Sequence, residues 1–151
     1  MYEFVIITQK GGSMQFRNED KIVVLHLQEG EELIKSIADF AKANGIEGGL
    51  VQGIGTTTRV KIGYYNESHS SYDILEFDEP MELLSAMGSI SMNDSEVVVH
   101  LHGSFADDEF SVLGGHIIEA EIFATGEFFI TKTGRIDRKH NEKFKLNLFD
   151  I

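Results

Sequence analysis

Three histidines carry the clearest chemical signal in this sequence. His100 and His102 are separated by one residue in the apolar run 96–102, and His116 follows a pair of glycines. Residues i and i+2 of a β-strand point to the same face, so a strand here would present two imidazoles side by side. The glycines permit close approach of another backbone. We therefore predict that His116 returns on a neighbouring strand and that the three imidazoles hold one metal ion.

Zinc is the metal that this set of ligands favours. The chain contains no cysteine, which leaves imidazole nitrogens and oxygens as metal ligands. Three neutral imidazoles leave a fourth tetrahedral position for water or a ligand, and zinc can lower the pKa of a bound water to about 7. A zinc-dependent hydrolase or lyase is therefore one hypothesis. The alternative is that the histidines bind no metal and form hydrogen bonds in a polar seam or subunit interface.

Two further groups of residues are candidates for a site. The acidic segment 107–109 lies between the histidines, and a carboxylate there could accept an imidazole N–H or act as a base. Glu109 is the candidate we name, and a solvated loop residue is the alternative. Gly53, Gly55 and Thr56 could line a small-ligand pocket with backbone donors and a hydroxyl. Otherwise they make a tight turn and a strand edge.

The elements that must position these residues indicate an α+β fold. Apolar residues recur with a helical period over 31–43, and Asn44 and Gly45 follow as a C-cap. Short β-branched and apolar runs predict strands at 2–8, 21–27, 48–58, 60–65, 72–77, 81–91, 96–102, 116–123, 128–131 and 144–149. Apolar and polar residues alternate in the last strand, which predicts one buried face. We expect a single domain, residues 1–151, with a mostly antiparallel sheet and one main helix.

The charge of the chain argues against DNA as a partner. It has 25 acidic and 13 basic residues, a net charge of −12 and a sequence pI near 4.8, which opposes attraction to phosphate. The exception is a basic cluster that is either a solvated hairpin face or a polyanion site. Its members are Lys132, Arg135, Arg138, Lys139, Lys143 and Lys145. No apolar run approaches the roughly 20 residues that span a bilayer, and no signal-peptide pattern opens the chain, so we expect a cytoplasmic protein without membrane contact.

Several segments in combination resemble the PPC domain family, also called PCC or DUF296. Its prokaryotic stand-alone members are described as having a PD1-like DNA-binding motif. The matching segments extend along nearly the whole chain, and their order and spacing make the resemblance specific. They are 27–33, 51–55, 81–88, 100–102, 113–116 and 124–127.

The resemblance implies a homotrimer with an α+β fold and a metal such as zinc on the residues that match the family's histidines, His100, His102 and His116. In plants the domain follows an AT-hook, an Arg-Gly-Arg-Pro segment that enters the DNA minor groove, and this sequence contains no such segment. The apolar run 128–130 predicts that both faces of its strand are covered, which agrees with a trimer. Our preferred hypothesis is a metal-binding PPC protein, and the alternatives are a DNA-binding or regulatory protein and a zinc-dependent hydrolase or lyase.

Overall fold

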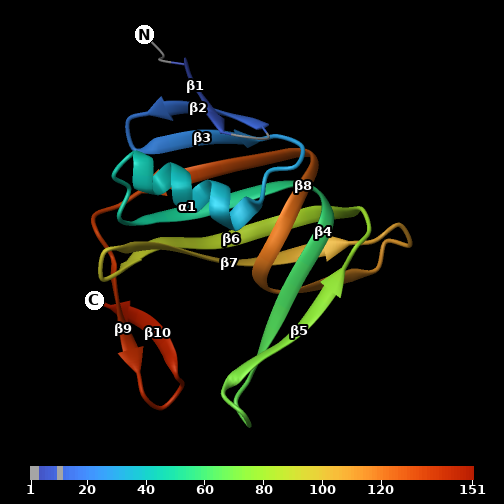
Figure 1. Ribbon diagram of the computed structural model, residues 1–151, viewed down its shortest axis with the longest axis vertical. Coiled ribbons are helices and arrows are strands. Elements are labelled where there is room, and N and C mark those ends of the chain that lie inside the picture. Colours follow the sequence, from blue (N-terminus) through green and yellow to red (C-terminus); the bar gives the residue numbers. More distant parts are fainter. Residues whose placement is uncertain (1–3, 10–11) are drawn as a thin grey trace.

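The computed structural model describes residues 4–9 and 12–151. Strands dominate this part of the chain, and one helix crosses one face of the sheet that they form (Figure 1). The elements are β1 (Phe4–Gln9), β2 (Gly12–Glu19), β3 (Ile22–Leu27), α1 (Leu33–Ala43), β4 (Gly49–Asn66), β5 (Ser71–Phe77), β6 (Met81–Asn93), β7 (Glu96–Ala106), β8 (Val112–Lys132), β9 (Asp137–Asn141) and β10 (Leu146–Asp150).

Helix α1 forms where the apolar period predicts it. The side chain of Glu32 caps the helix by accepting two backbone N–H groups of its first turn. Glu32 also accepts from the backbone N–H of Ala120 at 3.0 Å, which ties the start of the helix to β8. The helix ends at Ala43 with Asn44 as its C-cap, and Gly45 follows with a φ of 63°. Its buried face consists of Leu33, Ser36, Ile37, Phe40 and Ala41.

The strands form one mixed sheet in which nearly every pairing is antiparallel. The long strands β4 and β8 pair with each other, β3 pairs with β8, and β6 pairs with β4. Strand β7 pairs with both β6 and β8, so β4, β6, β7 and β8 close on themselves. Among the described residues, the one parallel pairing joins Met92 of β6 to Asp137 of β9. The mostly antiparallel sheet with one helix is therefore as predicted.

The hydrophobic core lies between α1 and the sheet face that the helix covers (Figure 1). Side chains alternate between the two faces over residues 126–130 of β8, because successive strand residues point in opposite directions. Phe128 and Ile130 are fully buried, whereas Phe129 between them is 46% exposed. Within one chain, the face that carries Phe129 is therefore not covered.

Several predicted strands differ from the observed ones. Residues 12–19 form β2, which was not predicted and which pairs with β1 and β3. Strands β4 and β8 run without interruption through the predicted breaks after 58 and 123, because bulges absorb the irregular pairing. The buried face predicted for 144–149 is wrong, since the β9–β10 hairpin extends away from the body and two residues of that face, Phe144 and Leu148, are 38% and 39% exposed (Figure 1). Residues 2 and 3 of the first predicted strand lie outside the described residues.

In the part of the chain that the structure describes, no helix has the length and apolar character needed to cross a membrane. The cytoplasmic location inferred from the sequence stays a prediction.

Candidate metal centre

Strands β7 and β8 bring the three histidines together. His100 and His102 share a face of β7, and His102 is paired directly with His116 of β8. The centroids of the three rings are 4.9 to 5.5 Å apart. One ring nitrogen from each histidine lies within 4.8 Å of the other two. The spacing of these residues in the sequence thus produces the expected cluster.

Close strand packing around the cluster depends on glycines. A Cβ atom at Gly88 of β6 would lie 1.8 Å from the carbonyl oxygen of His100. A Cβ atom at Gly114 would lie 2.5 Å from the carbonyl oxygen of Gly103, and one at Gly115 would lie 2.8 Å from a carbonyl oxygen of β4. Any larger residue would therefore push these strands apart. The close approach expected for the glycine pair before His116 is confirmed, and Gly88 adds a third such position.

The environment of the cluster favours the neutral form of His100 and His116. Burial, followed by the neighbouring His116, Arg138 and His102, lowers the pKa of His100 to about 4. Burial also lowers the pKa of His116, with contributions from His102 and Arg138. A neutral imidazole offers a lone pair to a metal ion. Nδ1 of His116 is buried without a hydrogen-bond partner among the described residues, which is unusual and fits a metal-binding nitrogen.

These pKa shifts predict that the metal-free protein loses stability in mild acid. Between pH 6.5 and about 4 the unfolded chain binds a proton at His100 that the folded chain does not bind. The free energy of unfolding therefore decreases as the pH is lowered through this range. We expect a loss of about 1 to 2 kcal/mol, because solvent screens part of the effect at a half-buried ring. Urea unfolding of chelator-treated protein at both ends of this range would measure it.

A matched pair of variants isolates the contribution of His100. His100→Gln should remove most of the acid-dependent loss, whereas His140→Gln should leave it unchanged because the side chain of His140 is 49% exposed. Equal pH dependence of the wild type and His100→Gln would contradict the prediction.

A pocket of about 240 Å³ opens beside the histidines. The ring of Tyr72 from β5 stacks on His116, with the centroids 4.8 Å apart and the planes at 27°. Arg138 of β9 and residues of β10 form the opposite wall, so the exposed hairpin closes the pocket from one side. The lining residues are Tyr72, Val98, Val99, His100, His116, Arg138, Leu146, Asn147 and Leu148.

Arg138 is held against the cluster by the hairpin and by β6. Its Nε donates to Ser91 Oγ at 2.7 Å, and its Nη1 donates to the carbonyl oxygen of Asn147 at 2.8 Å. Its Nη2 lies 3.5 Å from both Ser89 Oγ and His100 Nδ1. The sequence pattern grouped Arg138 with a basic hairpin face, but the structure turns its guanidinium inward. Neither Arg138 nor Tyr72 has a local signal that links it to the histidines, because the fold alone brings these distant segments together.

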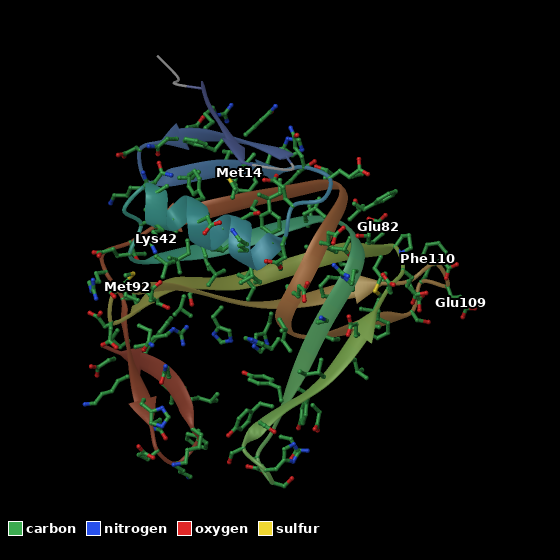
Figure 2. The ribbon with its side chains drawn as sticks, in the orientation of Figure 1. Met14, Lys42, Glu82, Met92, Glu109 and Phe110 are labelled. Atoms are coloured by element: carbon green, nitrogen blue, oxygen red, sulfur yellow. The ribbon has the colours of Figure 1, made fainter. Side chains whose placement is uncertain are left out.

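The structure does not bring Glu109 to the histidines. Glu109 lies in the turn between β7 and β8, and Figure 2 shows it with Phe110 at the tip of that hairpin. His102 is four residues before the end of β7, so the turn begins about 13 Å further along the strand. The backbone N–H of Glu109 donates to Asp107 Oδ1 at 3.0 Å, which is a feature of the turn itself.

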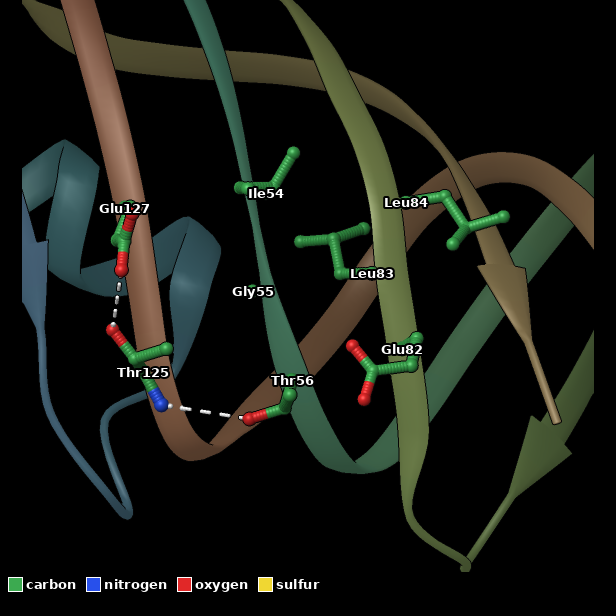
Figure 3. Close-up of a pocket in the computed structure, with 8 residues that line it drawn as sticks. All are labelled: Ile54, Gly55, Thr56, Glu82, Leu83, Leu84, Thr125 and Glu127. Carbon is green, nitrogen blue, oxygen red and sulfur yellow. Dashed lines mark hydrogen bonds between the residues drawn. The ribbon is translucent and has the colours of Figure 1, made fainter. Parts of the chain in front are cut away.

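Gly53, Gly55 and Thr56 line hollows on a different part of the sheet. Gly55 and Thr56 contribute to a pocket of about 280 Å³ that also contains Glu82 and Thr125 (Figure 3). Gly53 lines a neighbouring hollow of about 360 Å³. All three residues lie within β4, so the predicted tight turn is wrong. Thr56 Oγ1 accepts the backbone N–H of Ala124 at 3.0 Å, which explains part of its role without a ligand. Ligand binding there stays a prediction.

Together, the fold and the cluster define a small strand-rich domain with three histidines gathered on two paired strands. The model of the Plants and Prokaryotes Conserved (PCC) domain matches residues 14–134 of this chain. The chain therefore belongs to the PCC domain family, also called PPC, and the resemblance drawn from the sequence is confirmed. A comparison with curated proteins found no match.

Solved structures of similar proteins share the fold over nearly their whole length. A plant- and prokaryote-conserved (PPC) protein of Pyrococcus horikoshii is 32% identical, with 100% of this chain and 95% of that chain covered and a TM-score of 0.81. A protein of Archaeoglobus fulgidus named as metal-containing is 30% identical, with 100% and 99% covered and a TM-score of 0.79. A "putative DNA-binding protein" of Bacteroides thetaiotaomicron is 28% identical, with 91% and 96% covered and a TM-score of 0.88.

Proposed function

We propose that this protein binds a divalent metal ion through His100, His102 and His116, and that this ion is zinc. The observation that carries the proposal is the convergence of three ring nitrogens within 4.8 Å on two paired strands. The lowered pKa values of His100 and His116 support it, because they keep both rings unprotonated at neutral pH. The name of the similar Archaeoglobus protein as metal-containing points in the same direction. Bound zinc would supply a Lewis acid and a position for a further ligand.

The donor set fits zinc with small adjustments. Ligand nitrogens of a tetrahedral zinc site lie about 3.3 Å from one another, given zinc–nitrogen distances of about 2.0 to 2.1 Å. The separations of up to 4.8 Å here would shorten by rotation of the side chains. His102 is exposed, so its ring has room for such a rotation.

Elemental analysis of protein purified without a metal-affinity tag tests the proposal. We expect near-stoichiometric zinc in the wild type and its loss in the His100→Ala/His102→Ala/His116→Ala variant. A His69→Ala/His140→Ala variant is the matched control, because both side chains are about half exposed and lie outside the cluster. Metal absent from the wild type even after zinc is supplied would contradict the proposal.

We also propose that the protein assembles with copies of itself, as the homotrimer that the family resemblance implies. The sheet face opposite α1 exposes Phe129, Met87 and Ile54 at 46%, 55% and 54%. Gln52 of β4 pairs with both Met87 and Phe129, so these three residues form a row across β6, β4 and β8, and Ile54 lies two residues further along β4. Exposed apolar side chains gathered on one sheet face are typical of a surface that is covered in an assembly.

DNA binding is the second candidate function, and the name of the Bacteroides protein favours it. The basic cluster gives it little support here. Arg135 is paired with Glu47 and Asp137, and Arg138 points into the pocket. Binding of duplex DNA at low salt that weakens on reversing the charges of Arg135, Arg138 and Lys139 would support this candidate, and absence of binding at low salt would eliminate it.

The hydrolase or lyase hypothesis needs a base beside the metal. None of the described residues that line the pocket is an aspartate or glutamate, and Glu109 lies at the far hairpin turn. Metal binding is therefore the function that the site supports best.

A further inference from the structure

The pocket beside the histidines carries an excess of positive charge in an otherwise acidic protein. The pocket is lined by no carboxylate, and among the described residues Arg138 forms no ion pair with one. The side chain of Arg138 is partly buried, and this burial lowers its pKa. A divalent ion on the histidines would place a further positive charge next to this guanidinium. Like charges so close in a partly desolvated pocket destabilise each other unless an anion lies nearby.

The guanidinium can still donate hydrogen bonds toward the pocket. Nη2 of Arg138 has only two contacts of 3.5 Å, to Ser89 Oγ and His100 Nδ1, which are at the limit of hydrogen-bond length. The planar fork of an arginine matches a carboxylate group well. The centroid of the Phe149 ring lies 4.8 Å from Cζ of Arg138. This contact and the hydrogen bond from Nη1 to the Asn147 carbonyl fix the orientation of the guanidinium.

The other residues that line the pocket favour a ligand with a short apolar part. Val99, Leu146 and Leu148 contribute aliphatic walls, and Tyr72 contributes an aromatic one. An inorganic anion such as phosphate would leave this apolar surface uncovered. The volume of about 240 Å³ holds roughly eight water molecules at about 30 Å³ each, which limits the ligand to a small molecule.

We infer that this pocket binds a small monocarboxylate, whose carboxylate group contacts both the metal on the histidines and the guanidinium of Arg138, and whose aliphatic part packs on the hairpin wall. The inference rests on the proposed metal site, because a divalent metal supplies two of the three positive charges that attract the carboxylate. It further assigns a role to the β9–β10 hairpin, which supplies Arg138 and two of the four aliphatic side chains that line the pocket.

Calorimetric titration of the metal-free protein with zinc, with and without butyrate, tests the inference at neutral pH. Coupling between two ligands is reciprocal and commonly amounts to about fivefold or more, so we expect butyrate to lower the dissociation constant of zinc by at least that factor. n-Butanol has the same aliphatic body without the charge and should have no effect. Inorganic phosphate should have a smaller effect than butyrate.

Variants of the pocket wall identify the contact. Arg138→Gln should still bind zinc but lose the butyrate effect, whereas Lys139→Gln, the next residue in the hairpin, should retain it. Leu146→Glu should bind zinc with no butyrate effect, because its own carboxylate occupies the pocket, and this variant decides the matter if Arg138→Gln does not fold. Zinc binding by the wild type that butyrate leaves unchanged, or that phosphate enhances as strongly, would overturn the inference while the proposed function stands. Absence of zinc binding by the wild type would overturn both.

Discussion

Saturating zinc is expected to raise the midpoint of thermal unfolding of the wild-type protein by about 5 to 10 °C. A ligand that binds only the folded state stabilises it by about 2.7 kcal/mol at a concentration 100 times its dissociation constant. For a domain of this size, each kcal/mol shifts the midpoint by about 2 to 4 °C. The three histidines lie on β7 and β8, which unfolding must separate, so the folded state alone presents the site. Differential scanning calorimetry with and without zinc measures the shift.

The controls for this shift follow from the chemistry of the ligands. The variant that lacks all three clustered histidines should show no shift, and the His69→Ala/His140→Ala variant should retain it. Magnesium should have little effect on the wild type, because it prefers oxygen ligands and the cluster offers nitrogen. An equal zinc shift in the triple variant would place the stabilising metal elsewhere on the protein.

The histidine cluster could be predicted because its information is local. The i, i+2 spacing of His100 and His102 fixes their common face once the segment is a strand, and glycines before His116 allow another backbone to approach. Helix α1 could be predicted for the same reason, since its apolar period and its C-cap are contained in one segment. The family resemblance, which the domain model confirms, supported the same conclusion from the order of the segments.

The pocket around the cluster could not be predicted, because its parts come from distant segments. Tyr72 and Arg138 are each more than 20 residues from the nearest clustered histidine, and no sequence pattern near them indicates a contact with the cluster. The apolar alternation at the end of the chain was interpreted as a buried strand face. In the structure those side chains line the pocket or lie exposed on the hairpin. The alternation therefore reflects the lining of the pocket and not burial in the core.

A glycine inside a strand was mistaken for a turn signal. Gly55 was interpreted as part of a turn, yet it lies within β4, where a Cβ atom would be 2.5 Å from the carbonyl oxygen of Thr125. Glycine here serves close packing of two strands and not a change of direction. Sequence patterns alone do not separate these two uses.

Substitutions of two neighbouring phenylalanines of β8 are expected to affect different properties of the protein. Phe128→Ala should reduce the free energy of unfolding by about 3 to 5 kcal/mol, because the ring is fully buried and its removal leaves a cavity in the core. Phe129→Glu should change the stability of the single chain little, because its ring is 46% exposed. It should instead abolish self-association, since it places a charge on the apolar face of β6, β4 and β8. Urea unfolding at several protein concentrations and analytical ultracentrifugation measure the two effects.

Phe110→Ala is the control for the loss of an exposed aromatic ring, because Phe110 is 88% exposed at the β7–β8 turn and lies outside that face (Figure 2). It should change neither the stability nor the association state. A wild type that stays monomeric at all concentrations would contradict the proposed assembly and leave the expectation for Phe128 untouched. If Phe129→Glu dissociates the assembly and zinc still binds, each chain contains a complete metal site. If zinc binding is lost together with the assembly, the metal centre depends on contacts between the chains.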